Sequence, residues 1–382
     1  MSLFTIKQIF KDNWSSFLAI YPVRPVVRRE IERMLECGDF SKGYTKYSCP
    51  NCGRYHLVPF RCHSRFCNTC SSAYQQDRSA TIAAKLVKCR HRHVVFTIPE
   101  ELREYFRQDR SLLHILFHTA ADVLLRWFHS LNKKELFEPG IVAGLHTFGR
   151  DLKWNPHIHI LVSEGAIGNI TKWKKFNFFP FSLLRKSWMT GLLKNMLDNL
   201  NPKIFNIRQF KNLVNMLYRT YKDGFYVNAP ATKFNDPQAV ANYITRYIAR
   251  PAMAQSRITA YDGSSVTFWY IDHATNEKTI VTLPAYKFIK KLIIHIPERS
   301  FNMLRYYGIY AKPNLVSEHL IKFLSKEQYS HYKRVLRKWR TRILLAFNRS
   351  PLICTCGATM VFSEIYLPGS LSKRPPPILK YT

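Results

Sequence analysis

The sequence is poor in acidic residues and glycine, and it lacks a long apolar run. Of its 382 residues, 25 are Asp or Glu and 58 are Lys or Arg, which gives a net charge of +33. No stretch approaches 18 uninterrupted apolar residues, and the charged N-terminus lacks the apolar core of a signal peptide, so we expect a cytoplasmic protein without a membrane partner. Only 14 residues are glycine and 46% are hydrophobic, a composition that excludes disorder for most of the chain.

The excess of positive charge and the aromatic content point to a polyanionic partner. Each Lys or Arg that neutralises a phosphate releases a counterion, so a charge of +33 favours nucleic-acid binding. The 26 Phe, 21 Tyr and 7 Trp residues suit a groove that follows a phosphate backbone and stacks bases. We therefore expect a folded protein that binds a nucleic acid.

The hydrophobic periodicity predicts a chain in three regions. We expect a helical lead-in and a cysteine-rich module over residues 1–88, a core over 89–312 and a basic helical region over 313–382. Strands alternating with helices between residues 90 and 285 indicate an α/β or α+β core. The expected strands cover 93–98, 140–148, 157–162, 266–272 and 279–283. The expected helices cover 74–88, 111–129, 181–200, 205–221, 236–250, 286–294, 298–307 and 317–348.

Two C-x-x-C pairs predict a metal site in the N-terminal region. Cys49 and Cys52 precede Cys67 and Cys70, with fourteen residues between the pairs. This spacing suits one tetrahedral zinc ion held by four thiolates, two from each tight turn. Nine cysteines in a reducing compartment argue for metal ligands or free thiols rather than disulfides. Buried free thiols are the alternative to the zinc site.

The loop between the two pairs contains further residues of interest. Cys62, His56 and His63 lie there and could be alternative ligands, could support the ligands by hydrogen bonding, or could be packing residues. Arg65 lies in the same loop, and we expect it to contact DNA, although a solvated basic face would have the same composition.

The remaining cysteines give weaker indications. Cys354 and Cys356 form only half a metal site, which other ligands or a partner chain could complete, and two free thiols are an equal alternative. Cys37 and Cys89 are isolated in the sequence. We interpret both as packing residues.

A histidine pair on a predicted strand suggests a second metal site. His157 and His159 are two residues apart, so they share one face of the strand and could bind one divalent cation. His146, at the end of the preceding strand, could supply a third nitrogen, and Asp151 could orient one imidazole. Buried histidines that only form hydrogen bonds are the alternative, because a pair of histidines on a strand is common without metal.

A tyrosine pair lies on the helix that we expect after Asp236. Tyr243 and Tyr247 are four residues apart, so their side chains share one helix face. Arg246 and Arg250 lie on the same helix and could hold phosphates. An aromatic stripe that packs on the core is the alternative.

In this order and setting, these motifs resemble those of the HUH endonuclease superfamily. The match is with its two-tyrosine transposases of the insertion-sequence family ninety-one. It runs from VPFRCHSRFCNTC through HVVFTIP, LHTFGRDLKWNPHIHILV and NYITRYIARP to HIPERSFNMLRYYGIYA and LICTCGATM, across roughly residues 45–360. The resemblance implies an α+β fold with a central antiparallel sheet flanked by helices, an N-terminal zinc-binding domain and a helical C-terminal region.

The resemblance also implies roles for the residues of these motifs. It makes His157 and His159, with His146 less securely, the ligands of a catalytic Mg²⁺ or Mn²⁺. It makes Tyr243 and Tyr247 the nucleophiles. The four paired cysteines would bind structural zinc.

The implied reaction is transposition of DNA. A tyrosine would cut single-stranded DNA at the ends of the mobile element and form a 5′-phosphotyrosine, and the free 3′-hydroxyl of another strand would later reverse that step in rolling-circle-like transposition. Arg305 could add a phosphate contact, with packing as an equal alternative, and the chain could act as an oligomer. One rival hypothesis is a non-catalytic zinc-dependent DNA-binding protein or a decayed transposase. Another is a metal-dependent nuclease that uses water.

Overall fold

The computed structural model describes residues 4–83, 85–230, 239, 241–245, 251–272, 275–311 and 352–369, with isolated positions between 330 and 350. Among these residues, no helix is both long enough and apolar enough to cross a membrane. The mixed α+β architecture with antiparallel sheets, which the resemblance implied, is confirmed.

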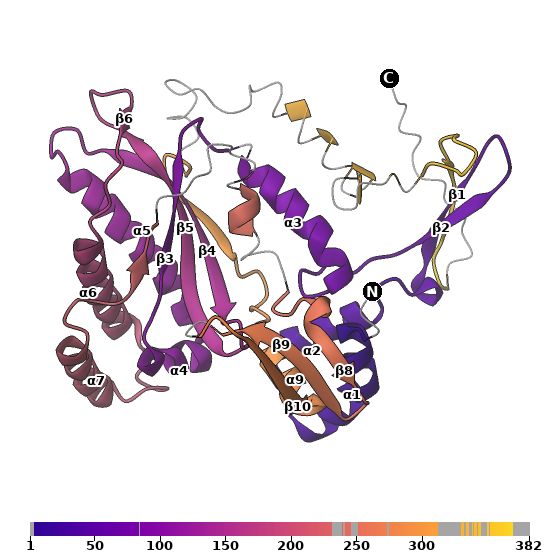
Figure 1. Cartoon of the computed structure of the whole chain (residues 1–382), viewed down its shortest axis with the longest axis horizontal. Helices are drawn as coiled ribbons and strands as arrows, with labels where there is room; N and C mark the ends of the chain where they lie inside the picture. The colour runs from indigo at the N-terminus through magenta and orange to yellow at the C-terminus, as the bar shows by residue number, and fades with distance from the viewer. Residues whose placement is uncertain are drawn as a thin grey trace.

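A six-stranded antiparallel sheet forms the centre of the molecule (Figure 1). Its strands are β3 (His91–Phe96), β4 (Glu138–Phe148), β5 (Trp154–Ile167), β6 (Lys174–Lys175), β7 (Val227–Asn228) and β11 (Leu304–Gly308). The order is β11-β4-β5-β3-β7, and β6 pairs with β5. The β4–β5 hairpin sets His146 directly opposite His157.

Helices cover one face of this sheet and bury its apolar side chains. They are α4 (Glu100–Gln108), η2 (Arg110–Leu112), α5 (Leu113–Ser130), α6 (Phe181–Asn199) and α7 (Ile207–Thr220). Because side chains alternate along a strand, Phe96, Ile141, Ile158 and Ile160 all point to this side and pack against α5 and α6. The main core therefore lies between the sheet and these helices.

The opposite face carries the alternate residues of the same strands. It is covered by α3 (Asn68–Ala83) and by the helical residues 241–245. Ile82 on α3 and Ile244 pack together against Val142 of β4 and Leu161 of β5. The histidines of β3, β4 and β5 lie on this second face by the same alternation.

A second core joins segments that are far apart in the sequence. Helices α1 (Ile6–Ile20) and α2 (Pro25–Leu35) pack against a three-stranded sheet and the helix that follows it. The elements on that side are η3 (Gln255–Arg257), β8 (Ile258–Tyr261), β9 (Ser265–Ile271), β10 (Lys278–Pro284) and α9 (Ala285–Ile293). The boundary at 88 remains a prediction about folding units, but this core crosses it.

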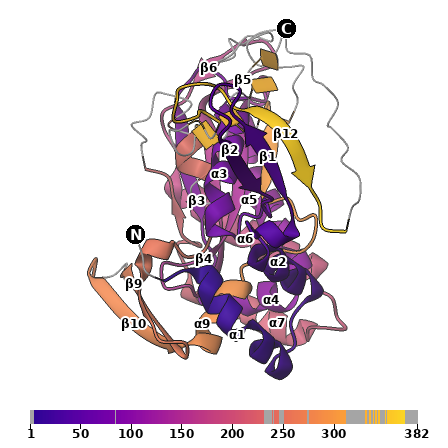
Figure 2. The same ribbon diagram turned by 90° about the vertical axis from the view of Figure 1, so that its right-hand side faces the viewer.

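The third sheet joins the two ends of the chain. After η1 (Phe40–Lys42), the hairpin β1 (Tyr44–Ser48) and β2 (Tyr55–Pro59) pairs with β12 (Val361–Tyr366) in the order β12-β1-β2. Figures 1 and 2 show β12 along this hairpin, at a distance from the central sheet. The sheet also crosses the expected boundary at 312. The predicted helix over 317–348 lies largely outside the described residues.

The helix predicted over residues 298–307 was wrong. Residues 304–308 instead form β11, the edge strand beside β4, in which Arg305 pairs with Ala143 and Tyr307 with Ile141. Aromatic residues favour a half-buried strand, and here Tyr306 and Tyr307 pack on opposite faces of the sheet. Pairing with β4 outweighed the local helical periodicity.

Candidate functional site

The cysteines form two clusters of four, and neither cluster is the predicted set. One consists of Cys37, Cys62, Cys67 and Cys70, and the other consists of Cys49, Cys52, Cys354 and Cys356. The predicted joint site of the two C-x-x-C pairs is therefore corrected, because the structure assigns one pair to each cluster. The intervening β2 explains the division, since an extended strand of five residues spans about 16 Å and carries the first pair away from the second.

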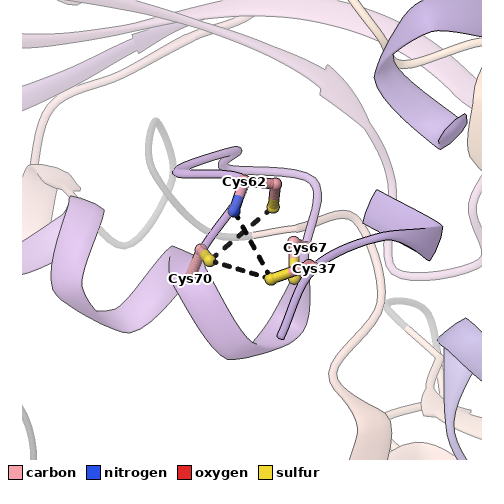
Figure 3. A group of neighbouring side chains, drawn as sticks. All are labelled: Cys37, Cys62, Cys67 and Cys70. Carbon is pink, nitrogen blue, oxygen red and sulfur yellow. Dashed lines mark hydrogen bonds between the residues drawn. The ribbon is translucent and has the colours of Figure 1, made fainter. Parts of the chain in front are cut away.

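The first cluster lies where α2, the 61–67 loop and the start of α3 meet (Figure 3). Its four sulfur atoms lie within 4.8 Å of one another, and Cys70 Sγ is 3.5 Å from Cys37 Sγ and 3.6 Å from Cys62 Sγ. A tetrahedral zinc ion with Zn–S bonds of about 2.3 Å sets neighbouring sulfurs about 3.8 Å apart. All four cysteines are buried, and their arrangement fits a structural zinc site.

Three histidines meet on the sheet face beneath α3. His146 comes from β4, and His157 and His159 come from β5, so the β4–β5 hairpin alone supplies the triad. His146 Nδ1 lies 3.1 Å from His157 Nε2. Two nitrogens bound to one cation at about 2.1 Å, at angles between octahedral and tetrahedral, are about 3.0–3.4 Å apart. The spacing of the triad therefore fits one cation.

Hydrogen bonds fix the orientation of two of these rings. His157 Nδ1 donates to the carbonyl oxygen of Asn155 at 2.7 Å, which leaves its Nε2 lone pair facing His146. His159 Nδ1 lies 2.8 Å from His93 Nε2. Asp151 does not take the predicted orienting position, because its carboxylate accepts from the backbone of Lys153 and pairs with the ammonium group of that residue.

Burial favours the neutral form of three imidazoles at the site. It lowers the pKa of His146 and of His159 well below the usual value, and nearby His157 lowers both further. Burial and His157 together lower the pKa of His93 to about 4. Because only a neutral imidazole can bind a cation, the lowered pKa values of His146 and His159 favour metal binding near neutral pH.

The first predicted tyrosine lies beside this triad. The ring of Tyr243 meets the ring of His93 edge-on, with centroids 4.9 Å apart. Its helical segment is held on α3 by the packing of Ile244 and by a hydrogen bond between Ser79 and Asn242. Tyr247, Arg246 and Arg250, which were predicted on the same helix, lie outside the described residues.

A basic cavity of about 870 Å³ adjoins the triad at His146. Arg65, which was predicted to contact DNA, lines this cavity, and its charge contributes to the lowered pKa of His146. The other cations of the lining are Arg29, Arg33, Arg78, Lys85 and Arg299. Glu30 and Glu298 also line it, so the balance is positive.

Two predicted residues lie away from this site. Arg305 on β11 points to the α5 side of the sheet, where its guanidinium lies against His114 and His118 and over the ring of Phe117. His56 is exposed on β2 and belongs to neither cysteine cluster.

Sequence reasoning missed two residues of these sites: Cys37, which was interpreted as a packing residue and belongs to the first cluster, and His93, which bonds His159. Cys354 and Cys356 were considered as half a metal site, and the structure places them with Cys49 and Cys52. A count of cysteines could have indicated two sites, because nine cysteines are two sets of four and one remainder, which is Cys89. No sequence pattern indicated that β3 would pair with β5, the pairing that brings His93 to His159.

Comparisons with known proteins agree with this geometry. A family described as "Transposase zinc-binding domain" matches residues 9–98, which contain the whole first cluster. A family described as "Putative transposase" matches residues 140–316, which contain the histidine triad and both tyrosines. No solved structure matches this chain.

Two curated proteins are similar over most of their length. The transposase for insertion sequence element IS801 from Pseudomonas savastanoi pv. phaseolicola is 28% identical, over 94% of this chain and 89% of its own. The putative transposase y4qJ from Sinorhizobium fredii is 25% identical, over 79% of each chain. Two transposase family models therefore match in the expected order, and the chain is similar along nearly its whole length to a transposase, as expected for the transposases of insertion-sequence family ninety-one.

Proposed function

We propose that this transposase is a metal-dependent endonuclease and strand transferase that cuts single-stranded DNA through a 5′-phosphotyrosine intermediate. The observation that carries the proposal is the contact chain from Tyr243 through His93 to His159. It joins a candidate nucleophile to a candidate cation site on one sheet face. The resemblance to two-tyrosine transposases supports the same assignment, including the rolling-circle-like course of transposition.

His146, His157 and His159 would hold the divalent cation. Their nitrogen spacing fits one ion, and burial favours the neutral form of His146 and His159. When bound, Mg²⁺ or Mn²⁺ polarises the scissile phosphate and neutralises its charge. Imidazole ligands alone would also suit zinc, so Mg²⁺ or Mn²⁺ rests on the resemblance and on oxygen ligands that the phosphate and water supply.

Tyr243 would act as a nucleophile, and Tyr247 as the second one. The phenol oxygen attacks phosphorus, the bond from phosphorus to the 3′ oxygen breaks, and the departing oxygen takes up a proton to become a 3′-hydroxyl. The new ester conserves the bond energy, so a 3′-hydroxyl can later attack the phosphotyrosine and release the enzyme. Positioning supplies most of the rate in such a phosphoryl transfer.

The basic cavity would guide the DNA backbone to the triad. Arg65, Arg78 and Lys85 line it beside His146 and can neutralise successive phosphates. Tyr74 and Tyr306 line the same cavity and offer rings for base stacking. A single strand is the substrate that leaves its bases free for such contacts.

The first cysteine cluster would bind zinc and hold α3 in place. Cys67 and Cys70 lie at the start of α3, and the same helix carries the Tyr243 segment at its other end. Zinc there would replace the apolar core that this short segment lacks. Its role is therefore to position the nucleophile as well as to support DNA binding.

A cleavage assay with tyrosine variants tests the proposal. The full-length protein is mixed with labelled single-stranded oligonucleotides from the ends of its own element, with Mn²⁺ or Mg²⁺, and products are separated on a denaturing gel. We expect a protein-linked band that requires the metal and is lost in the Tyr243→Phe/Tyr247→Phe variant. Tyr218→Phe, an exposed tyrosine on α7, is the matched control and should retain the band.

The same gel distinguishes the proposal from the two alternative hypotheses. Cleaved DNA that persists in the double variant would favour the nuclease that uses water. Binding without any cleavage, in the presence of metal and of the correct ends, would favour the non-catalytic DNA-binding protein. Either result would contradict the tyrosine mechanism.

A further inference from the structure

The second cysteine cluster has no place in the reaction proposed above. Cys354 and Cys356 lie outside both matched family ranges, which end at residues 98 and 316. We propose that Cys49, Cys52, Cys354 and Cys356 bind a second structural zinc ion, which fastens the C-terminal segment 352–369 to the N-terminal hairpin. This inference is independent of the tyrosine chemistry.

The sulfur positions fit a metal and do not fit disulfides. Cys49 Sγ lies 3.5 Å from Cys356 Sγ, and Cys52 Sγ lies 3.5 Å from Cys354 Sγ. All four sulfurs lie within 4.8 Å of one another. A disulfide would need about 2.05 Å, whereas a zinc tetrahedron needs about 3.8 Å. Each short distance joins one N-terminal and one C-terminal cysteine, so the four form one compact set.

Two similar turns supply the ligands, one from each end of the chain. In the first turn, the N–H of Gly53 donates to the carbonyl oxygen of Cys49 at 3.1 Å. In the second turn, the N–H of Gly357 donates to the carbonyl oxygen of Cys354 at 2.9 Å. Both glycines have positive φ, at 71° and 86°, a conformation that a side chain would strain. A glycine that closes the turn after a cysteine pair is the arrangement expected of a zinc-binding turn.

The segment that the site would hold is attached to the hairpin by the β12–β1 ladder and by two ring contacts, Tyr44 with Tyr366 and Tyr47 with Phe362, but it packs on only a small apolar core. Its apolar contacts are small, with Leu352, Cys354 and Met360 packed around Cys49. Strand β12 pairs with β1, with a register shift between Lys46 and Tyr47, and many of its side chains are exposed. A zinc ion that joins residues 302–307 positions apart would supply the stability that so small a core lacks.

The site would also fix the far end of a strongly basic stretch. Residues 312–351 contain ten Lys or Arg and two Glu, and they connect the catalytic sheet to Cys354. With zinc in place, the described residues 352–356 that follow this stretch are held at the hairpin.

The first test counts zinc bound to thiolates in the full-length protein. A mercurial reagent that reacts with thiols releases zinc from cysteine sites but not from histidine sites, and a chromogenic chelator measures the release. We expect two zinc ions per wild-type chain and one per Cys354→Ser/Cys356→Ser chain. Cys89→Ser, which alters the one cysteine outside both clusters, is the control and should keep two. One zinc per wild-type chain would overturn the proposal, as would two in the double variant.

A second measurement uses only the wild-type protein and so does not depend on how the variant folds. Cys52 and Cys356 are exposed, so as free thiols they would react quickly with iodoacetamide. Mass spectrometry should find both protected in the zinc-loaded protein and alkylated after chelation of the metal. Fast alkylation in the loaded protein, or a disulfide between these cysteines, would contradict a second zinc site.

Discussion

At the scale of single residues, His93 connects the two halves of the proposed active site. Its Nε2 atom lies 2.8 Å from Nδ1 of His159, and its ring touches that of Tyr243. If His159 binds a cation through Nε2, its Nδ1 carries the proton and donates to His93. In the proposed mechanism His93 is therefore a positioning residue, which contacts one candidate ligand and one candidate nucleophile.

Replacing His93 by alanine should weaken the apparent affinity for Mn²⁺ by about 10–100-fold, because His159 loses the acceptor that fixes its tautomer. The measurement is the nicking rate as a function of Mn²⁺ concentration. His93→Gln restores an acceptor and should recover most of the affinity, and His56→Ala, at an exposed position on β2, should behave as wild type. An unchanged Mn²⁺ response in His93→Ala would contradict this role.

A second prediction concerns the basic cavity. Arg78→Ala should weaken single-strand binding and reduce the slope of log K against log salt by about 0.7, the value for one lost phosphate contact. Arg126→Ala removes an arginine from the outer side of α5, where it pairs with Asp122, and should change neither quantity. Fluorescence anisotropy at several salt concentrations measures both. Equal slopes for Arg78→Ala and wild type would remove this arginine from the DNA path.

At the scale of elements, hydrophobic periodicity predicted the helices and strands whose formation depends mainly on local sequence. The helices over 111–129 and 181–200 match α5 and α6, and the strands over 140–148 and 157–162 match β4 and β5. Apolar residues recur regularly in these segments because each helix or strand buries one face in the same core. Periodicity therefore located the histidine triad on one hairpin before the structure was known.

Long-range pairing was not predictable in the same way. The C-x-x-C spacing suggested one zinc site because the two pairs are close in sequence, but β2 separates them and each pair finds its partners elsewhere. The contribution of Cys37 depends on where α2 ends, and that of Cys354 depends on β12 pairing with β1. Such contacts follow from tertiary packing, which leaves no fixed spacing in the chain.

Loss of the first metal site should destabilise the region that carries α3. Cys70→Ser, at a buried ligand position, should lower the free energy of unfolding by several kcal/mol, because zinc binding contributes on the order of 10 kcal/mol to the folding of such modules. Urea denaturation followed by circular dichroism measures the change, and Cys89→Ser is the comparison. Nicking should fall in parallel, because α3 holds the Tyr243 segment. Unchanged stability would contradict a structural zinc at this cluster.

A substitution that leaves a cavity between the central sheet and its covering helices should lower the stability of the protein. Trp188 on α6 is fully buried, its Nε1 donates to the carbonyl of Thr97 at 2.7 Å, and its ring packs on Phe96. Trp188→Ala should cost about 3–5 kcal/mol of stability. Phe178→Ala, at a side chain that is 74% exposed, should cost little. A cost below about 1 kcal/mol for Trp188→Ala would mean that this face is not the main core.

At the scale of the whole molecule, segments that are far apart in the sequence pack together. The N-terminal helices share a core with β8–β10 and α9, and the N-terminal hairpin pairs with β12 (Figure 2). The chain carries a net charge of +33, and cations line the cavity at the triad. The fold therefore brings the cysteine clusters, the histidine triad and the basic cavity together in one molecule.

The most direct test of this account is to identify the residue that becomes linked to DNA. The wild-type protein is incubated with Mn²⁺ and a single-stranded oligonucleotide from its element end, the DNA is trimmed with nuclease, and tryptic peptides are sequenced by mass spectrometry. The account predicts a nucleotide on the phenol oxygen of Tyr243 or Tyr247, absent when His157→Ala/His159→Ala replaces the wild type. Efficient cleavage with no nucleotide on either tyrosine, or with a nucleotide on another residue, would contradict it.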